Sequence, residues 1–248
     1  MSRVSLPLLL LCATGAAAAA PIAFLRDARA RCLDGSRGAY YVEPASAPVN
    51  ATKFILYLEG GGECASAASC LAATRGVLGS STFDTPTRTF DEGLFFASGE
   101  ASNPFSGYTR VYLPYCSQDL HSGTRTTNSS DTFGLYFSGH LIFASLLDDL
   151  TAWHGLAAAT EFILTGGSAG GIGVWINANY LASRLPVDCR VTLVSHDGLG
   201  LRERGAICTS ACASPTIAPP PFPAAAYVPQ RALPCHPCTR ARRARRSS

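Results

Sequence analysis

One short segment constrains the fold of this chain more than any other. Residues 162–171 read Phe-Ile-Leu-Thr-Gly-Gly-Ser-Ala-Gly-Gly, so an apolar run enters a G-x-S-x-G turn and a helical pattern follows at once. A turn this tight between a strand and a helix needs small residues beside the serine, and Gly166, Gly170 and Gly171 supply them. The segment predicts an exposed nucleophile, Ser168, at the end of a buried strand. A glycine-rich turn without chemistry is the alternative interpretation.

Further apolar runs place this segment in a larger sheet. Runs apolar on both faces predict buried strands, and they occupy residues 54–58, 111–113, 162–165 and 191–195. Apolar residues at helical spacing lie between the last three runs: Phe143, Leu146, Leu147, Leu150 and Trp153, then Ile172, Trp175, Ile176 and Tyr180. Gly155 and Pro186 would end these helices. Strands alternating with helices predict an α/β fold, a mostly parallel sheet with helices on both faces.

A second glycine-rich turn follows the first of these strands, where Glu59 precedes Gly60, Gly61 and Gly62. Backbone N–H groups can approach a substrate closely only where side chains are absent, as in the oxyanion loops of esterases. A flexible turn and a phosphate-binding loop are the alternatives, but no G-K-[ST] follows.

The N-terminus has the pattern of a cleaved signal peptide over residues 1–20. Arg3 precedes a short leucine-rich run, and small residues lead up to Pro21. A membrane anchor is the alternative, but the run is short for a bilayer and no second one follows, so we expect no stable membrane insertion. Two N-x-S/T sequons, at Asn50 and Asn128, fit a secreted, extracellular protein. Nine cysteines remain after residue 20, an odd number for a disulfide framework.

The composition changes near Cys208. Proline and alanine dominate residues 208–248 and no periodicity survives, so we expect a disordered tail after a single domain at 21–207. Five arginines near the C-terminus account for the net charge of +3. Without them the chain has 15 basic and 17 acidic residues, so the rest carries a small negative charge. The body therefore has no electrostatic footprint for nucleic acid. The tail cysteines and His236 lack the supporting core of a zinc site, so no metal is expected.

Four segments together resemble the pectin acetylesterase family, which also contains Notum-type secreted carboxylesterases. They are the L-x-G-G-G-x-C pattern at 58–64, the P-Y-C at 114–116 with S-G at 122–123, the G-x-S-A-G-G at 166–171, and an S-D-x-G-like run at 195–199. The resemblance implies an α/β-hydrolase fold that is secreted, with a cell-wall location possible, and that removes acyl groups, acetyl above all, without a cofactor. Its substrate would be an acylated polysaccharide or an acylated protein.

The resemblance also assigns roles to residues. It makes Ser168 the nucleophile of a Ser-Asp-His triad and gives the oxyanion to the N–H groups of Gly61, Gly62 and Ala169. It further implies two disulfides, Cys32–Cys116 and Cys64–Cys70.

The chain departs from the family after about Leu201. The family's catalytic aspartate and histidine lie beyond the S-D-x-G run, where this chain has its proline-rich tail, and Asp197 matches a structural aspartate. We therefore expect a fold that is incomplete at the C-terminus and an impaired esterase, because serine without a base is a poor nucleophile. A non-catalytic secreted binding module is the first alternative. The second is a lipase-like hydrolase with Asp197 as its acid.

Overall fold

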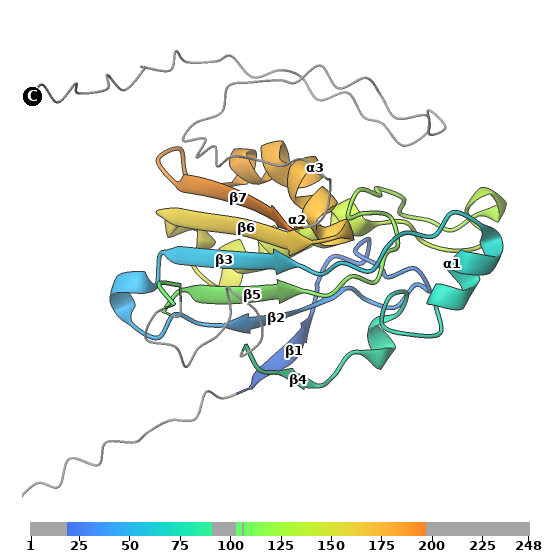
Figure 1. The fold of residues 1–248 in the computed structure, drawn as a ribbon, viewed down its shortest axis with the longest axis horizontal. Coiled ribbons are helices and arrows are strands. Elements are labelled where there is room, and N and C mark those ends of the chain that lie inside the picture. The colour runs from blue at the N-terminus through green and yellow to red at the C-terminus, as the bar shows by residue number, and fades with distance from the viewer. Residues whose placement is uncertain (1–18, 91–102, 106, 197–248) are drawn as a thin grey trace, which may run out of the picture.

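The computed structural model describes residues 19–90, 103–105 and 107–196. In this part of the chain, strands form one sheet in the order β4-β1-β2-β5-β3-β6-β7 (Figure 1). The strands are β1 Ala20–Phe24, β2 Ala39–Glu43, β3 Lys53–Leu58, β4 Thr87–Arg88, β5 Thr109–Leu113, β6 Glu161–Gly167 and β7 Arg190–His196. The helices are α1 Ala67–Ala73, α2 Gly139–Trp153 and α3 Ala169–Arg184, with short 3-10 helices at Pro48–Asn50, Ser81–Phe83, Ser130–Thr132 and Leu156–Ala158.

The half of the sheet that carries β5, β3, β6 and β7 is parallel throughout. These are the four strands predicted from the apolar runs, so the predicted parallel core of the α/β fold is confirmed. Leu58 pairs with Gly166, and Gly167 pairs with His196. The carboxyl ends of β3, β6 and β7 therefore meet at one edge, which is where ligands bind in open α/β sheets.

The other half of the sheet is antiparallel and was not predicted. β2 pairs with β5, and β1 pairs with both β2 and β4. β1 takes in Ala20, which is buried although the sequence pattern assigned it to the signal segment. Residues 1–18, Asp197 and the predicted tail at 208–248 lie outside the described residues.

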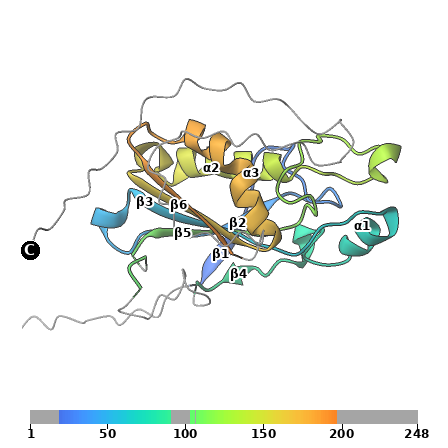
Figure 2. The same ribbon diagram turned by 45° about the horizontal axis from the view of Figure 1, so that its top comes forward.

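The two longer helices cover one face of the sheet. Phe143 and Leu146 of α2 and Val174 and Leu181 of α3 belong to one buried cluster with residues of β3, β5 and β6. Figure 2 shows α2 and α3 side by side over that face. Aromatic and aliphatic side chains gather on the opposite face, among them Tyr41, Ile55, Tyr108, Tyr112 and Ile163. Among the described residues, the second face is thus covered by connecting segments and not by a long helix.

The predicted apolar stripe of α3 is wrong, although the helix itself is confirmed. Trp175 and Ile176 are exposed, by 39% and 42%. The buried positions are one step away and include Gly170, Val174, Asn177 and Leu181. Small residues are buried at the start of α3 because this end of the helix lies very close to β3. The spacing of apolar residues alone therefore predicts the wrong buried face.

The described residues include no helix with the length and apolar character needed to cross a bilayer. The predicted α2 is confirmed, with Phe143, Leu146, Leu147 and Leu150 buried. Trp153, the last residue of its predicted stripe, is 59% exposed, and the Arg26 guanidinium lies 4.0 Å from its ring centroid.

Candidate active site

Ser168 stands at the turn between β6 and α3. Its backbone has φ 52° and ψ −119°, a conformation that costs a residue with a side chain about 1–3 kcal/mol. The residue is exposed, whereas its neighbours Thr165 and Ala169 are buried. A strained turn that lifts one serine out of the backbone is the geometry of a nucleophile elbow.

The elbow is possible because the chain around it lacks side chains. A Cβ on Gly170 would overlap the carbonyl oxygen of Leu58, so α3 can approach β3 only with glycine there. A Cβ on Gly60 would lie 3.0 Å from the Cβ of Ser168 and would overlap the carbonyl oxygen of Gly167. The second glycine-rich turn therefore lies directly against the elbow, and its role as an oxyanion loop stays a prediction.

The backbone N–H groups of Gly61, Gly62 and Ala169 are available at this place. None of the three donates a hydrogen bond to another group in the described part of the chain. Gly61 and Gly62 are exposed, with φ values of 153° and 76°. Free N–H groups near the N-terminus of a helix suit a developing negative charge.

The described histidines do not supply an evident base. No hydrogen bond in the described residues joins a histidine side chain to the Ser168 hydroxyl. His140 Nδ1 lies 2.7 Å from Asn177 Oδ1, and His154 Nε2 lies 3.5 Å from the Tyr40 hydroxyl, which agrees with structural roles. His196 ends β7, and its carbonyl accepts the N–H of Ser168 at 2.8 Å.

His121 is the best buried of the described histidines and was assigned no role from the sequence. It is 1% exposed, and its Nε2 lies 3.0 Å from the carbonyl oxygen of Glu59. Burial lowers the pKa of His121 to about 4, so the ring is neutral at physiological pH. A carbonyl only accepts, and Nε2 therefore carries the proton.

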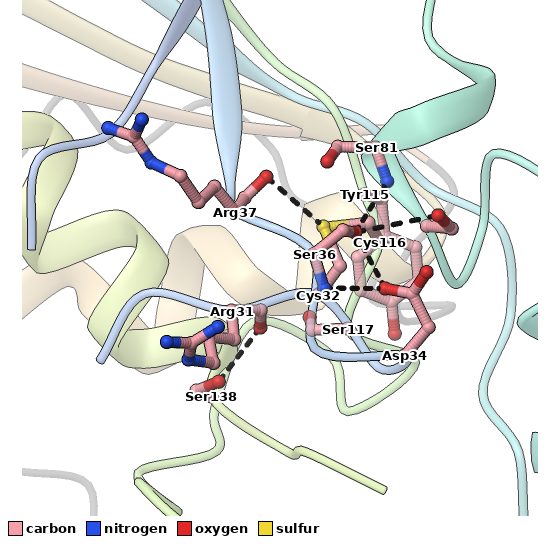
Figure 3. The surroundings of a disulfide bond; sticks show 12 residues. Arg31, Cys32, Asp34, Ser36, Arg37, Ser81, Tyr115, Cys116, Ser117 and Ser138 are labelled. Carbon is pink, nitrogen blue, oxygen red and sulfur yellow. Dashed lines mark hydrogen bonds between the residues drawn. A yellow bond between two sulfur atoms is a disulfide. The ribbon is translucent and has the colours of Figure 1, made fainter. Parts of the chain in front are cut away.

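Both disulfides implied by the family resemblance are present. Cys32–Cys116 joins residues 84 apart in the sequence, and Cys64–Cys70 joins residues 6 apart. Figure 3 shows the first bond among its neighbours, where Cys116 lies next to Tyr115. The second bond follows the glycine loop and fixes it to α1. Cys189 has no disulfide partner among the described residues.

A small pocket of about 90 Å³ adjoins Glu59, one residue before Gly60. It is lined by aromatic, charged and aliphatic residues: Tyr41, Glu59, Val77, Phe83, Asp84, Thr85, Arg88, Tyr112 and Pro114. The Arg88 guanidinium lies 3.5 Å from the Tyr112 ring centroid. Burial, reinforced by the negative charge of Glu59, raises the pKa of Asp84 to about 6.

The remaining sequence-based assignments concern modification and metals. Asn128 is exposed and its Nδ2 donates to the carbonyl of Gly134 at 3.0 Å. Asn50 is half-buried beside Gly107. The described residues contain no group of three or more metal-ligating side chains, and the cysteines and histidine of the tail lie outside them.

A mixed sheet with a parallel half, a strained serine between a strand and a helix, and a glycine loop against that serine define the α/β-hydrolase class. The family model "Pectinacetylesterase" matches residues 13–214. This chain belongs to the pectinacetylesterase family.

Individual relatives agree with that assignment. The chain is 35% identical to pectin acetylesterase 4 of Arabidopsis thaliana over 70% of its own length and 42% of the relative. It is 37% identical to the palmitoleoyl-protein carboxylesterase NOTUM of Schmidtea mediterranea over 65% of its own length and 30% of the relative. The crystal structure of the Wnt deacylase Notum from Drosophila matches with a TM-score of 0.59 at 25% identity, over 72% of this chain and 52% of that one. The chain thus spans less than half the length of these two curated relatives.

Proposed function

We propose that this protein is a secreted serine ester hydrolase that removes acyl groups, with Ser168 as its nucleophile. The observation that carries the proposal is the strained, exposed Ser168 with the glycine loop packed against it. Its membership of a family of carboxylic ester hydrolases supports the reaction class.

The reaction would begin with attack of the Ser168 hydroxyl oxygen on the carbonyl carbon of the ester. The carbonyl oxygen becomes an oxyanion and accepts hydrogen bonds from the N–H groups of Gly61, Gly62 and Ala169. The alcohol then leaves with the proton that the Ser168 hydroxyl lost, and the ester oxygen of Ser168 keeps the acyl group. Water hydrolyses this acyl-enzyme, giving its oxygen and one hydrogen to the acid and its other hydrogen back to Ser168. No cofactor takes part in these steps.

The acyl acceptor would be a polysaccharide, as the names of the pectin acetylesterases imply, or a protein, as the name of the Notum relatives implies. The pocket beside Glu59 favours the polysaccharide. Its aromatic rings, carboxylates and Arg88 suit a hydroxyl-rich sugar better than a long acyl chain. Nucleic acid is not expected as a partner.

The test is hydrolysis by the full chain, produced through a secretory pathway that forms the disulfides. The assay follows release of 4-nitrophenol from 4-nitrophenyl acetate, and release of acetate from acetylated pectin. Ser168→Ala should abolish the protein-dependent rate. Ser183→Ala is the matched control and should keep this rate, because Ser183 lies in α3, and its hydroxyl donates to the Tyr180 carbonyl.

Equal rates for the wild type and Ser168→Ala would refute the proposal. A non-catalytic binding module predicts that result together with retained affinity for acetylated pectin. A palmitoleoylated peptide offered in parallel separates the two acceptor classes, because only the preferred one should show Ser168-dependent release.

A further inference from the structure

One neighbouring segment, residues 115–121 after β5, holds the glycine loop formed by Glu59, Gly60, Gly61 and Gly62. The hydroxyl of Tyr115 donates to the carbonyl of Gly62 at 3.0 Å, and His121 Nε2 donates to the carbonyl of Glu59 at 3.0 Å. A longer contact of 3.4 Å joins Gln118 Nε2 to the carbonyl of Gly61. Three carbonyls of the loop are thus turned toward this segment.

Fixing a carbonyl also fixes the N–H on the other side of the same peptide bond. In a trans peptide the two groups point in opposite directions. The peptide between Gly61 and Gly62 therefore presents the Gly62 N–H away from Gln118. His121 holds the Glu59–Gly60 peptide and Tyr115 holds the Gly62–Glu63 peptide. The two ends of the stretch that carries the Gly61 and Gly62 N–H groups are therefore anchored.

The supporting segment has an unusual backbone that other contacts maintain. Gln118, Leu120 and His121 have positive φ values of 54°, 59° and 58°, which non-glycine residues seldom adopt. The carboxylate of the partly buried Asp119 accepts from the Ser117 hydroxyl and from the N–H groups of Gly123 and Gly139. Strain of this kind persists where surrounding structure determines it, and it concentrates at functional sites.

His121 is the member of the segment that touches both halves of the candidate oxyanion site. Its ring lies 4.6 Å from the Tyr115 ring, centroid to centroid, and packs against Gly173 of α3, where a Cβ would lie 2.9 Å from His121 Cδ2. Asn177, also on α3, donates to the His121 carbonyl at 2.9 Å. α3 begins with Ala169, whose N–H is the third proposed donor. The side chain of His121 therefore spans the distance between α3 and the glycine loop.

We propose that His121 is a positioning residue for the oxyanion loop, which sets the Gly61 and Gly62 N–H groups against the Ser168–Ala169 turn by donating to the Glu59 carbonyl while packed on Gly173. The inference rests on the proposed function, since it assigns the purpose of the loop to oxyanion binding. His121 does not contact the substrate and is not the base.

Two substitutions separate the hydrogen bond from the packing. His121→Phe keeps a ring against Tyr115 and Gly173 but removes the donor, whereas His121→Gln keeps an N–H donor of similar reach. His154→Gln, at the end of α2, is the matched histidine control. The measurement is the ¹⁵N order parameter of the Gly61 and Gly62 amides in the full chain.

We expect order parameters near 0.85 in the wild type and in His154→Gln, a fall below about 0.6 in His121→Phe, and recovery in His121→Gln. Unchanged order parameters in a folded His121→Phe would overturn the proposal. If His121→Phe does not fold, Tyr115→Phe removes the donor at the other end of the loop. Rigid Gly61 and Gly62 amides in that variant would overturn the loop support, and mobile ones would support it.

The second measurement is Ser168-dependent hydrolysis of 4-nitrophenyl acetate. In His121→Phe, kcat should fall at least tenfold with KM nearly unchanged, because oxyanion contacts act in the transition state, and His121→Gln should recover most of the loss. A fall confined to KM would overturn the proposal. Absence of any Ser168-dependent rate in the wild type counts against the proposed function alone, since the order parameters still decide whether His121 positions the loop.

Discussion

The N–H of Ser168 donates a 2.8 Å hydrogen bond to the carbonyl oxygen of His196. The bond joins the turn after β6 to the last residue of β7, where the two strands end side by side. It satisfies a backbone donor that the tight turn would otherwise leave open. The strained conformation of the serine is therefore supported from outside the turn, and it depends on β7 being in place.

The backbone of Ser168 gives a first prediction about stability. At φ 52° and ψ −119° a Cβ is unfavourable, so Ser168→Gly should be more stable than Ser168→Ala by about 1 kcal/mol. At Ser183, inside α3, the order should reverse, because alanine stabilises a helix relative to glycine by a similar amount. Urea unfolding of the four variants measures both differences. A more stable alanine at both positions would show that the elbow carries no strain.

A second prediction concerns the contact between α3 and β3. Gly170→Ala places a methyl group onto the Leu58 carbonyl oxygen and should cost about 3 kcal/mol or more, because both partners are backbone. Gly76→Ala is the control, since nothing lies within 4 Å of its Cβ position, and its effect should stay within about 0.5 kcal/mol. Urea unfolding followed by tryptophan fluorescence reports both. Similar stabilities for the two variants would contradict the close approach.

His121 predicts how stability depends on pH. Its pKa in the folded chain is about 4, below the usual 6.5, because the ring is buried. Between pH 6.5 and 4 the unfolded chain takes up a proton that the folded chain refuses. The contribution of neutral His121 to the free energy of unfolding is therefore fully present above pH 6.5. It falls by about 3 kcal/mol as the pH drops to 4.

His121→Gln should remove this slope. The difference in unfolding free energy between the two proteins, measured by urea at several pH values, is the quantity to follow. Burial also raises the pKa of Asp119, which acts in the opposite direction, but this contribution is common to both proteins and cancels. A pH-independent difference would mean that His121 titrates normally.

The two disulfides should differ in their contribution to stability. Closing a loop across 84 residues restricts the unfolded chain more than closing one across 6, by about 4–5 against about 2 kcal/mol in the chain-entropy account. Cys32→Ala/Cys116→Ala should therefore destabilise the protein more than Cys64→Ala/Cys70→Ala does. Urea midpoints of the two double variants under oxidising conditions test the order. A larger destabilisation by Cys64→Ala/Cys70→Ala would show that contacts in the folded protein, and not loop closure, dominate the effect.

The rate of turnover gives a fifth prediction. Because no described histidine is hydrogen-bonded to the Ser168 hydroxyl, we expect Ser168-dependent hydrolysis to be slower than that of Arabidopsis pectin acetylesterase 4 by about a thousandfold or more. Both proteins are assayed side by side on 4-nitrophenyl acetate. Comparable rates, abolished by Ser168→Ala, would show that an effective base acts on Ser168.

The parts of the fold that sequence could predict are those with a local signal. The four parallel strands, α2 and the elbow follow from apolar runs and glycine spacing. β1, β2 and β4 are short and antiparallel, and their residues have no distinctive period. Apolar spacing predicts the wrong face of α3, because a close approach to Leu58 buries Gly170 and hydrogen bonds to His121 and Gly173 bury Asn177.

The candidate site divides in the same way. Ser168 and the loop at Gly61 and Gly62 carry motifs that can be read directly. Tyr115, Gln118 and His121 hold that loop through contacts more than fifty residues away in the chain, and through positive φ values that no sequence pattern predicts. Only the three-dimensional structure shows that these residues support the loop.

The position of β3 determines the order in which the protein can assemble. β3 pairs with β5 on one side and with β6 on the other. Lys53 of β3 pairs with Glu161 of β6, which is synthesised more than a hundred residues later. Strand pairs that are distant in sequence form slowly, because the entropy of closing a long loop is lost before the contacts between the strands stabilise it. Cys32 and Cys116 can meet before β6 has been made, so oxidation of the nascent chain is able to fix the first half of the sheet early. The turn at Ser168 needs both β6 and the His196 carbonyl of β7, so it can form only after these strands have been made.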